Sequence, residues 1–210
     1  EFWGQGPTIR SIIKSCGVEE SLVEGRKVFK YDEKIEPSKK TGVKRRGIGL
    51  ARGFHCSGTG GPKEGEVIDY SSAMIKINED GSVDLCTPVT DHGGGTLDAL
   101  RKIVSETLKV PYDLVGLSPA DTMNTGYDVC THATRGVYCG GGAVLNVARK
   151  VKEMLLEVAG RLMDEHACDL ELVLDEEAHQ GRVQVPGYPQ KSMTIGQIAK
   201  QAQNNSWGTI

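Results

Sequence analysis

Three consecutive glycines, Gly93–Gly95, stand at the junction between a strand-like and a helix-like segment. Before them, apolar residues alternate in 73–77 and 83–87 around a turn signal at 79–81, which predicts a β-hairpin. After them, apolar residues recur at helical spacing from Leu97 to Leu108. The chain therefore has three residues without side chains at the start of a helix. This restricts the folds that the chain can adopt and the ligands that can bind at the junction.

The loop Gly93-Gly94-Gly95-Thr96 has two interpretations. Consecutive glycines let a ligand approach the backbone, and a helix N-terminus offers unpaired N–H groups and partial positive charge to an anion, which is typical of a phosphate cradle. The sequence has neither the Gly-Lys-Ser/Thr of a Walker loop nor the spaced glycines of a Rossmann fingerprint. A glycine-rich turn with no ligand fits the loop equally well.

A second glycine run, Gly140–Gly142, opens a segment whose helical spacing predicts the longest helix. Directly before this run lie two hydroxyls, a histidine and a guanidinium, in the stretch Thr131, His132, Ala133, Thr134 and Arg135. Such groups suit a multiply hydrogen-bonded ligand, for example a phosphorylated heterocycle. The alternative is close helix packing through the glycines. If the run binds a ligand, we expect both glycine regions to meet at one wall of a common cavity.

The remaining pattern mixes strands and helices without regular alternation. Short strands are predicted near 114–117, 170–174 and 183–185, a strand-like segment begins at 47–54, and a terminal helix follows Thr194. This indicates an α+β fold, with two α/β layers and a mixed sheet. We divide the chain into a helical segment with a charged connector at 1–46, broken at Gly17 and Gly25, an α+β core that binds the ligand at 47–165, and short strands with a terminal helix at 166–210.

The charge balance excludes some classes of partner. The chain has 25 Lys and Arg against 28 Asp and Glu, for a net charge of −3, so no basic surface indicates nucleic acid or anionic lipid. The longest uncharged stretches fall short of the roughly 20 apolar residues that a membrane helix needs, and the first residues have no signal-peptide pattern. We therefore expect no nucleic acid and no membrane as partners, and a cytoplasmic location.

The residues that most often bind metals or act as nucleophiles are scattered along the sequence. The six cysteines contain no Cys-x-x-Cys pair and no Cys/His cluster at zinc spacing, so we expect reduced and mostly buried thiols. His92 and His132 lie beside the two glycine regions and are candidates for contact with a ligand. No Ser-His-Asp or Cys-His arrangement is found, so we assign no catalytic residue and no metal ligand.

The order of these motifs resembles the molybdenum-cofactor-binding subunit of the xanthine dehydrogenase and aldehyde oxidase family, the molybdenum hydroxylases. The match runs from about residue 44 to residue 165. The segments that carry it, in chain order, are Gly47-Ile48-Gly49-Leu50-Ala51, Asp80-Gly81-Ser82-Val83, Asp91-His92-Gly93-Gly94-Gly95-Thr96, Val110-Pro111, Asp121-Thr122, Thr131-His132-Ala133-Thr134-Arg135 and Gly142-Ala143-Val144.

This resemblance implies a molybdenum-cofactor-binding-domain-like fold and a role in binding molybdopterin, in some enzymes as its cytosine dinucleotide. The implied cofactor-binding residues are Gly93, Gly94, Gly95, Thr96, Thr131, His132, Ala133, Thr134 and Arg135. The family's enzymes hydroxylate aldehydes or nitrogen heterocycles with oxygen from water, and they pass electrons to iron-sulfur clusters and usually FAD. The metal does the redox chemistry, and the protein supplies placement and hydrogen bonds.

Two departures from the family pattern affect whether we expect activity and bound cofactor. Gly94 stands where the family usually has Gln, and the family's catalytic Glu, in a Gly-Glu motif, has no counterpart here. By this resemblance the chain is an interior fragment of a larger subunit, and we expect neither activity nor bound cofactor from the chain alone. Its expected partners are the remaining segments of the molybdenum subunit and the iron-sulfur and FAD subunits or domains. The alternatives are a non-catalytic structural or interaction domain of the same ancestry and an unrelated phosphate-binding domain.

Overall fold

The computed structural model describes residues 15–35, 43, 47–53, 55 and 69–210, which belong to two compact units, 1–56 and 57–210. The first unit contains α1 (Val18–Phe29) and the short α2 (Tyr31–Lys34). Helix α1 continues through Gly25, so the break predicted there is wrong, because the flanking residues form helix regardless of one glycine. The strand predicted to begin at 47 is also wrong for the described part, since residues 47–53 are exposed and belong to no strand.

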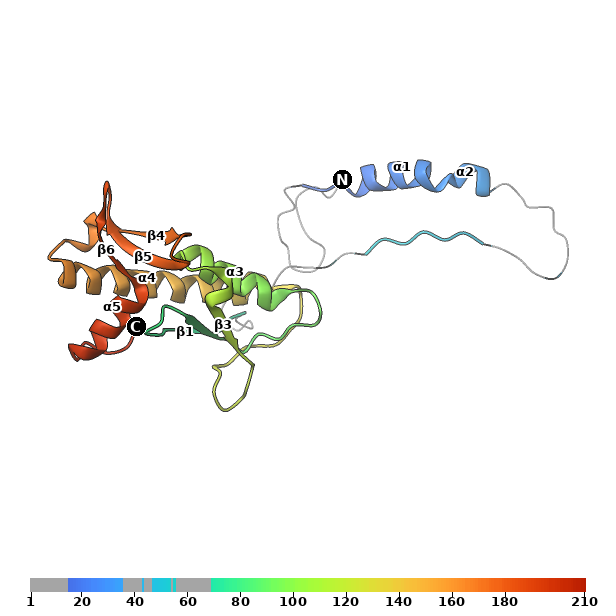
Figure 1. Ribbon diagram of the computed structural model, residues 1–210. Helices are drawn as coiled ribbons and strands as arrows, with labels where there is room; N and C mark the ends of the chain where they lie inside the picture. The colour runs from blue at the N-terminus through green and yellow to red at the C-terminus, as the bar shows by residue number, and fades with distance from the viewer. Residues whose placement is uncertain (1–14, 36–42, 44–46, 54, 56–68) are drawn as a thin grey trace. The chain divides into compact units, whose positions relative to one another are not determined.

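The second unit begins with the predicted hairpin (Figure 1). Strand β1 (Met74–Ile77) pairs antiparallel with β2 (Val83–Cys86), and β2 pairs in parallel with β3 (Val115–Ser118), which gives a mixed sheet. The hairpin turn is closed by the Asp80 side chain, whose Oδ1 accepts from the Ser82 backbone N–H at 2.9 Å, and by Gly81 at φ +87°. The alternating apolar pattern therefore predicted this hairpin correctly.

Two helices cover this sheet. Helix α3 (Thr96–Leu108) connects β2 to β3 through the turn η1 (Tyr112–Leu114), and α4 (Gly141–Met163) is the longest helix of the described residues. Each helix buries one apolar stripe: Leu100, Val104 and Leu108 from α3, and Val144, Val151 and Leu155 from α4. The helical spacing in the sequence therefore identified both buried faces.

A second sheet is fully antiparallel. It contains β4 (Glu171–Asp175), β5 (Gln180–Val185) and β6 (Tyr188–Thr194), and it follows the turn η3 (Ala167–Asp169). Strand β6 was not predicted, because this edge strand is mostly exposed and its sequence lacks apolar alternation. The terminal helix α5 (Ile195–Asn204) begins at the predicted cap: Thr194 Oγ1 accepts from the Gln197 N–H at 3.2 Å, and Gln197 Oε1 accepts from the Thr194 N–H at 3.0 Å.

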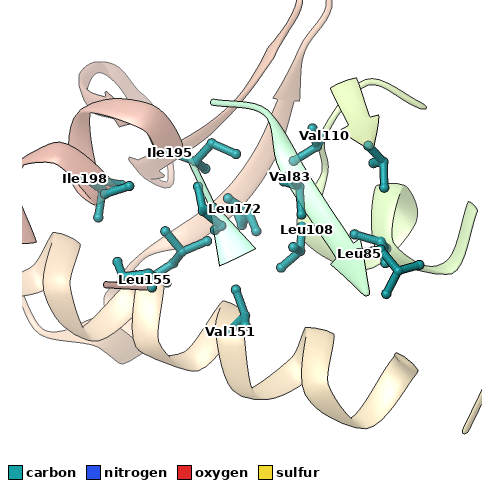
Figure 2. Close-up of a cluster of buried hydrophobic side chains, with 14 of the residues drawn as sticks. Val83, Leu85, Leu108, Val110, Val151, Leu155, Leu172, Ile195 and Ile198 are labelled. Atoms are coloured by element: carbon teal, nitrogen blue, oxygen red, sulfur yellow. The ribbon is translucent and has the colours of Figure 1, made fainter. Parts of the chain in front are cut away.

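One apolar core joins both sheets and helices α3, α4 and α5 (Figure 2). Ile195 and Ile198 from α5 lie in the same buried cluster as Leu155 of α4 and Val83 of β2. The backbone N–H of Ile77 also donates to the carbonyl of Ile210 at 2.8 Å. The fold is α+β, as predicted, and its C-terminal residues complete the core under the hairpin that leads to the glycine loop.

Three further observations bear on the predicted chemistry. Among the described residues, no helix is both long enough and apolar enough to cross a bilayer, and no group of His, Cys, Asp and Glu is arranged to hold a metal ion. The five described cysteines are free. The expectation that they are mostly buried is wrong, because Cys16, Cys130 and Cys168 are exposed and Cys86 and Cys139 are only partly buried; Cys56 lies outside the described residues.

Candidate functional site

The glycine loop leads from β2 into α3 and is open to solvent. Gly93 and Gly95 have φ of +93° and +75°, a conformation that L-amino acids with side chains rarely adopt. A Cβ atom on Gly93, Gly94 or Gly95 would meet no described atom within 4 Å. Backbone conformation therefore requires glycine at two positions, and at Gly94 the structure leaves room for a side chain or a ligand.

The N–H groups of this loop already bind an anion from the chain itself. Asp91 Oδ1 accepts from the N–H of Gly93 at 2.7 Å and of Gly95 at 3.2 Å, and Asp91 Oδ2 accepts from the N–H of Leu97 at 3.2 Å. The carboxylate thus occupies the donors that the phosphate-cradle hypothesis assigned to a ligand. A ligand at this loop has to bind beside a negative charge, which favours a polar or donor-bearing group over a phosphate at this position.

Asp91 should stabilise the fold in a pH-dependent way. The backbone hydrogen bonds, led by that from Leu97, outweigh the loss of hydration and hold the pKa of the Asp91 carboxyl below its ordinary value. Because folding lowers this pKa, the stabilisation is complete above the ordinary value of about 4, and it is lost as the pH falls from there through the lower pKa of the folded state. We expect Asp91→Ala to lower the melting temperature at pH 7 and to lower it less at pH 3.

Thermal unfolding of the wild type and Asp91→Ala across this pH range measures the difference. Asp91→Asn keeps one acceptor oxygen and loses the charge, so its melting temperature at pH 7 should lie between those of the other two. An equal loss at pH 7 and pH 3 would show that the ionised carboxylate does not hold the loop.

Arg135, one of the predicted binding residues, is buried inside the second loop. Its side chain is only 1% exposed, and it forms ion pairs with Asp69 and, at 2.6 Å from Nη1, with Asp128. Nη1 also donates to the carbonyl of Cys130 at 2.7 Å, and Nη2 donates to the carbonyl of Tyr70. Burial lowers the pKa of the guanidinium, but the two carboxylates outweigh it and raise that pKa. Arg135 therefore fixes this loop and does not present a free guanidinium to a ligand.

The residues before Arg135 adopt an unusual backbone. Ala133 and Thr134 both have left-handed φ angles, of 47° and 55°, although neither is glycine. For a β-branched residue such as Thr134 this conformation is strained by about 1–3 kcal/mol. The strained pair is followed directly by the π-helical turn η2 (Gly136–Gly140), a form often found at functional sites. The ion pairs of Arg135 stabilise this backbone, in which Thr131 is exposed and His132 is half-buried.

The two loops lie side by side, as predicted. A Cβ atom on Gly136 would stand 3.2 Å from Cγ2 of Thr96, so η2 and the start of α3 are in contact. Thr90 Oγ1 and Thr131 Oγ1 are 3.1 Å apart and share a hydrogen bond. The regions that begin at Gly93 and at Thr131, about forty positions apart in the sequence, therefore meet at the ends of β2, α3 and α4.

The second glycine run serves mainly to pack helices. A Cβ atom on Gly140 would stand 2.7 Å from Cγ2 of Val89, and one on Gly141 would stand 3.1 Å from Cδ1 of Ile103. At Gly142 a Cβ atom would meet no described atom within 4 Å. Close helix packing, the alternative to ligand binding at this run, therefore explains Gly140 and Gly141. It also brings α4 against α3 and so places the two loops together.

An open cavity of about 600 Å³ lies beside this junction. It is lined by polar and small residues from the end of β2 and from the 120–131 loop: Pro88, Thr90, Ala120, Asp121, Thr122, Thr125, Gly126, Tyr127, Asp128, Cys130 and Thr131. Thr131 is the one predicted binding residue in this wall, and Gly93–Thr96 do not line it. The loops therefore converge as expected, but the cavity is lined by Thr131 and by residues outside the predicted binding set, among them Asp121 and Thr122 of the motif order.

The sequence analysis missed Asp69, Tyr70, Tyr127 and Asp128. Asp69 and Tyr70 are more than sixty positions from Arg135, and no local pattern links them. Of the predicted candidates, His92 is exposed and His132 is half-buried. The ion pair between His179 and Asp113, with 2.8 Å between Nε2 and Oδ2, lies elsewhere in the unit, between β4–β5 and η1. Cys139 adjoins Asp69, and burial raises the pKa of its thiol, which makes it a poor nucleophile.

Comparison with known proteins identifies the class to which this fold and site belong. Residues 24–209 match the family described as molybdopterin cofactor-binding domain, so the chain belongs to that family. The putative xanthine dehydrogenase molybdenum-binding subunit XdhA of Escherichia coli K12 is 29% identical over 163 residues, which are 77% of this chain and 21% of that protein. The resemblance stated from the motif order is thereby confirmed.

Other relatives support the same assignment. The carbon monoxide dehydrogenase large chain of Afipia carboxidovorans is 27% identical over 162 residues, 76% of this chain and 19% of that protein. The crystal structure of quinoline 2-oxidoreductase from Pseudomonas putida 86 superposes with a TM-score of 0.58 at 28% identity, over 67% of this chain and 17% of that one. The chain spans about a fifth of the length of the curated relatives it matches.

Proposed function

We propose that this chain is the cofactor-binding part of a molybdenum hydroxylase, an oxidoreductase of the xanthine dehydrogenase type that hydroxylates an aldehyde or a nitrogen heterocycle. The observation that carries the proposal is the meeting of the Gly93–Thr96 and Thr131–Arg135 loops at one end of the fold, across the contact of Gly136 with Thr96. Family membership supports the same conclusion. The chain contributes binding and orientation, and the full subunit supplies the remaining groups.

The residues at the site fit molybdopterin. The bare backbone at Gly93–Gly95 leaves open space where side chains would stand, so a bulky ring system can approach it. The hydroxyls of Thr90 and Thr131 and the half-buried ring of His132 offer hydrogen bonds nearby. When bound, the cofactor supplies the metal that carries out the redox chemistry. In this proposal Gly93–Thr96, Thr131, His132 and Thr134 contact the cofactor, while Ala133 and Arg135 hold the second loop in position.

The proposed partners follow from the share of the relatives that the chain spans. The remaining segments of the molybdenum subunit would complete the site, and iron-sulfur and FAD subunits or domains would accept electrons. Exposed apolar side chains next to the site, among them Tyr70, Met123, Tyr127 and Tyr138, are suited to packing against those segments. We propose neither nucleic acid nor a membrane as a partner, and we propose a cytoplasmic location, with the cofactor in its molybdopterin or cytosine dinucleotide form.

The test is molybdenum and pterin analysis of the native full-length complex, expressed in a host that makes the cofactor. We expect roughly one molybdenum per subunit. Gly95→Val should abolish retention of both, because a β-branched residue disfavours φ +75°. Gly187→Val is the matched control: Gly187 also has a positive φ, +80°, and open space around its Cβ, but it lies in the β5–β6 turn. That variant should keep the cofactor.

The alternative function, a non-catalytic structural or interaction domain of the same ancestry, rests on Gly94, where the family usually has Gln. This alternative predicts that the wild-type complex also contains no molybdenum, as Gly95→Val does in the main proposal. That result would contradict the proposed cofactor-binding role. Equal molybdenum in wild type and Gly95→Val would instead show that the cofactor binds away from the glycine loop.

A further inference from the structure

The second sheet ends at a strand whose outer edge has no neighbour. In the order β4-β5-β6, β4 pairs only with β5, over Glu171–Asp175 and in unbroken register. In an antiparallel pair, every second residue turns its N–H and C=O groups away from the neighbouring strand. Among the described residues, no other backbone group pairs with β4. The outward-facing groups of β4 are therefore available to a further strand.

The other sheet edges of the described residues are protected against such pairing. Strand β6 contains Pro189, which has no N–H to donate, and Lys191, and a bulge interrupts its pairing with β5. Strand β1 already donates the Ile77 N–H to the carbonyl of Ile210, and β3 has only four residues, one of them glycine. Strand β4 contains no proline, glycine, lysine or bulge, so it is the one unprotected edge among the described strands.

The ends of β4 carry an excess of negative charge. Five of the nine residues 169–177 are acidic, and none is basic. Asp175 is neutralised by Arg182 of β5, with 2.8 Å between Oδ2 and Nη2. The other four acids are exposed and form no ion pair among the described residues: Asp169, Glu171, Glu176 and Glu177. This edge therefore attracts a strand that carries lysine or arginine at the matching positions and repels an acidic strand.

A second copy of the same edge is a poor partner for β4. Antiparallel pairing of two β4 strands about Val173 would place Glu171 of one copy opposite Asp175 of the other. It would also place Asp169 opposite Glu177. Like charges directly opposite each other destabilise a sheet, so the charge pattern favours a basic strand over self-pairing.

We propose that β4 is a docking edge for another protein, which adds an extended segment rich in lysine or arginine as a fourth, antiparallel strand of this sheet. Its basic side chains lie opposite Glu171 and Glu177, and an apolar side chain lies opposite Leu174, which is 42% exposed. Backbone hydrogen bonds supply the affinity, and the charges set the register. The inference goes beyond the proposed function and does not depend on it.

The test measures binding of an end-capped peptide, Lys-Lys-Thr-Val-Thr-Val-Lys-Thr-Lys, to the full 210-residue chain by titration calorimetry. In antiparallel register, lysines of this peptide lie opposite Asp169, Glu171 and Glu177, and a valine lies opposite Leu174. We expect the peptide to bind at least about tenfold more tightly than the same peptide with glutamate at each lysine position. Equal affinity for the two peptides, or binding of neither, would overturn the inference.

Two N-methylated versions of the peptide separate strand pairing from simple attraction between charges. Methyl groups on alternate backbone nitrogens, at odd or at even positions, remove the donors from one edge of an extended peptide and leave its charge unchanged. One version should lose binding and the other should keep it, because only one edge of the peptide faces β4. Equal behaviour of the two versions would contradict the proposed strand pairing.

Substitutions of Leu174 test the edge in the protein itself. Leu174→Lys and Leu174→Glu lose the same exposed apolar side chain and differ in the sign of the charge that they place on β4. The lysine variant should bind the basic peptide at least about tenfold more weakly than the glutamate variant. Melting temperatures of both variants show that each is folded. Equal affinities in the two folded variants would place the peptide away from β4.

Two further measurements exclude other occupants of this edge. In size-exclusion chromatography, the chain should form no dimer that Leu174→Lys dissociates, since such a dimer would make a second copy the occupant and reject the proposal. The basic peptide should also bind the native full-length complex. Loss of binding there would show that other segments of the same subunit cover β4, and that no separate protein docks on it.

Discussion

Replacing Arg135 with Met should cost the fold about 3–5 kcal/mol, enough to unfold a marginally stable domain. The guanidinium is 1% exposed, and its two ion-pair partners are nearly as buried, Asp69 at 4% and Asp128 at 10%. A methionine fills similar volume but leaves the carboxylates without their cation and the carbonyls of Tyr70 and Cys130 without this donor. Urea unfolding, followed by circular dichroism, measures the loss.

The control is an arginine of the same unit that makes no such contacts. Arg149 is an exposed residue of α4, and Arg149→Met should change stability by no more than about 0.5 kcal/mol. Arg135→Lys keeps the charge but cannot reach both carboxylates and both carbonyls at once, so its loss should be intermediate. A loss below about 1 kcal/mol in Arg135→Met would mean that the two carboxylates relax into solvent, and that the loop is not held as described.

Arg135 also shows where sequence reasoning reaches its limit. The stretch Thr131–Arg135 was identified as functional, but a guanidinium in a polar loop looks the same in sequence whether it faces a ligand or is buried. Its burial is decided by Asp69, 66 positions earlier, and by the carbonyl of Tyr70. Long-range contacts of this kind have no local signature, because nothing in the intervening residues constrains the distance.

One other difference between the sequence-based prediction and the structure had a local sequence signal that would have predicted it. Asp91 lies four residues before Gly95, the N-cap of α3, and an aspartate side chain often accepts from the backbone N–H two residues on, so its hydrogen bond from Gly93 followed from the sequence. By contrast, β6 pairs with β5 through backbone hydrogen bonds while most of its side chains are exposed, and alternation of apolar residues cannot reveal such a strand. The hairpin, α3 and α4 were predictable because burial of one face imposes a period on the sequence.

The C-terminal helix and the site are coupled through a glycine with no role in binding. Gly196 in α5 is buried, and a Cβ atom there would stand 2.5 Å from the carbonyl oxygen of Glu79 and 2.7 Å from the N–H nitrogen of Gly81. Both are backbone atoms of the β1–β2 turn, so no side-chain rotation relieves the clash. Helix α5 and the turn must separate, and β2, which leads to Asp91, must shift with the turn.

We therefore expect Gly196→Ala to destabilise the unit by about 3 kcal/mol, at the upper end of the range for overpacking, even though alanine favours helix. Gly142→Ala in α4 is the matched control. Its Cβ meets no described atom within 4 Å, so helix propensity alone should apply and raise stability by up to about 1 kcal/mol. Urea unfolding of both variants measures the change in the free energy of unfolding, which should fall in Gly196→Ala and rise in Gly142→Ala. If Gly196→Ala were as stable as the wild type, the contact between α5 and the hairpin turn would be looser than the structure has it, and the C-terminal helix would not fix the strand that leads into the glycine loop.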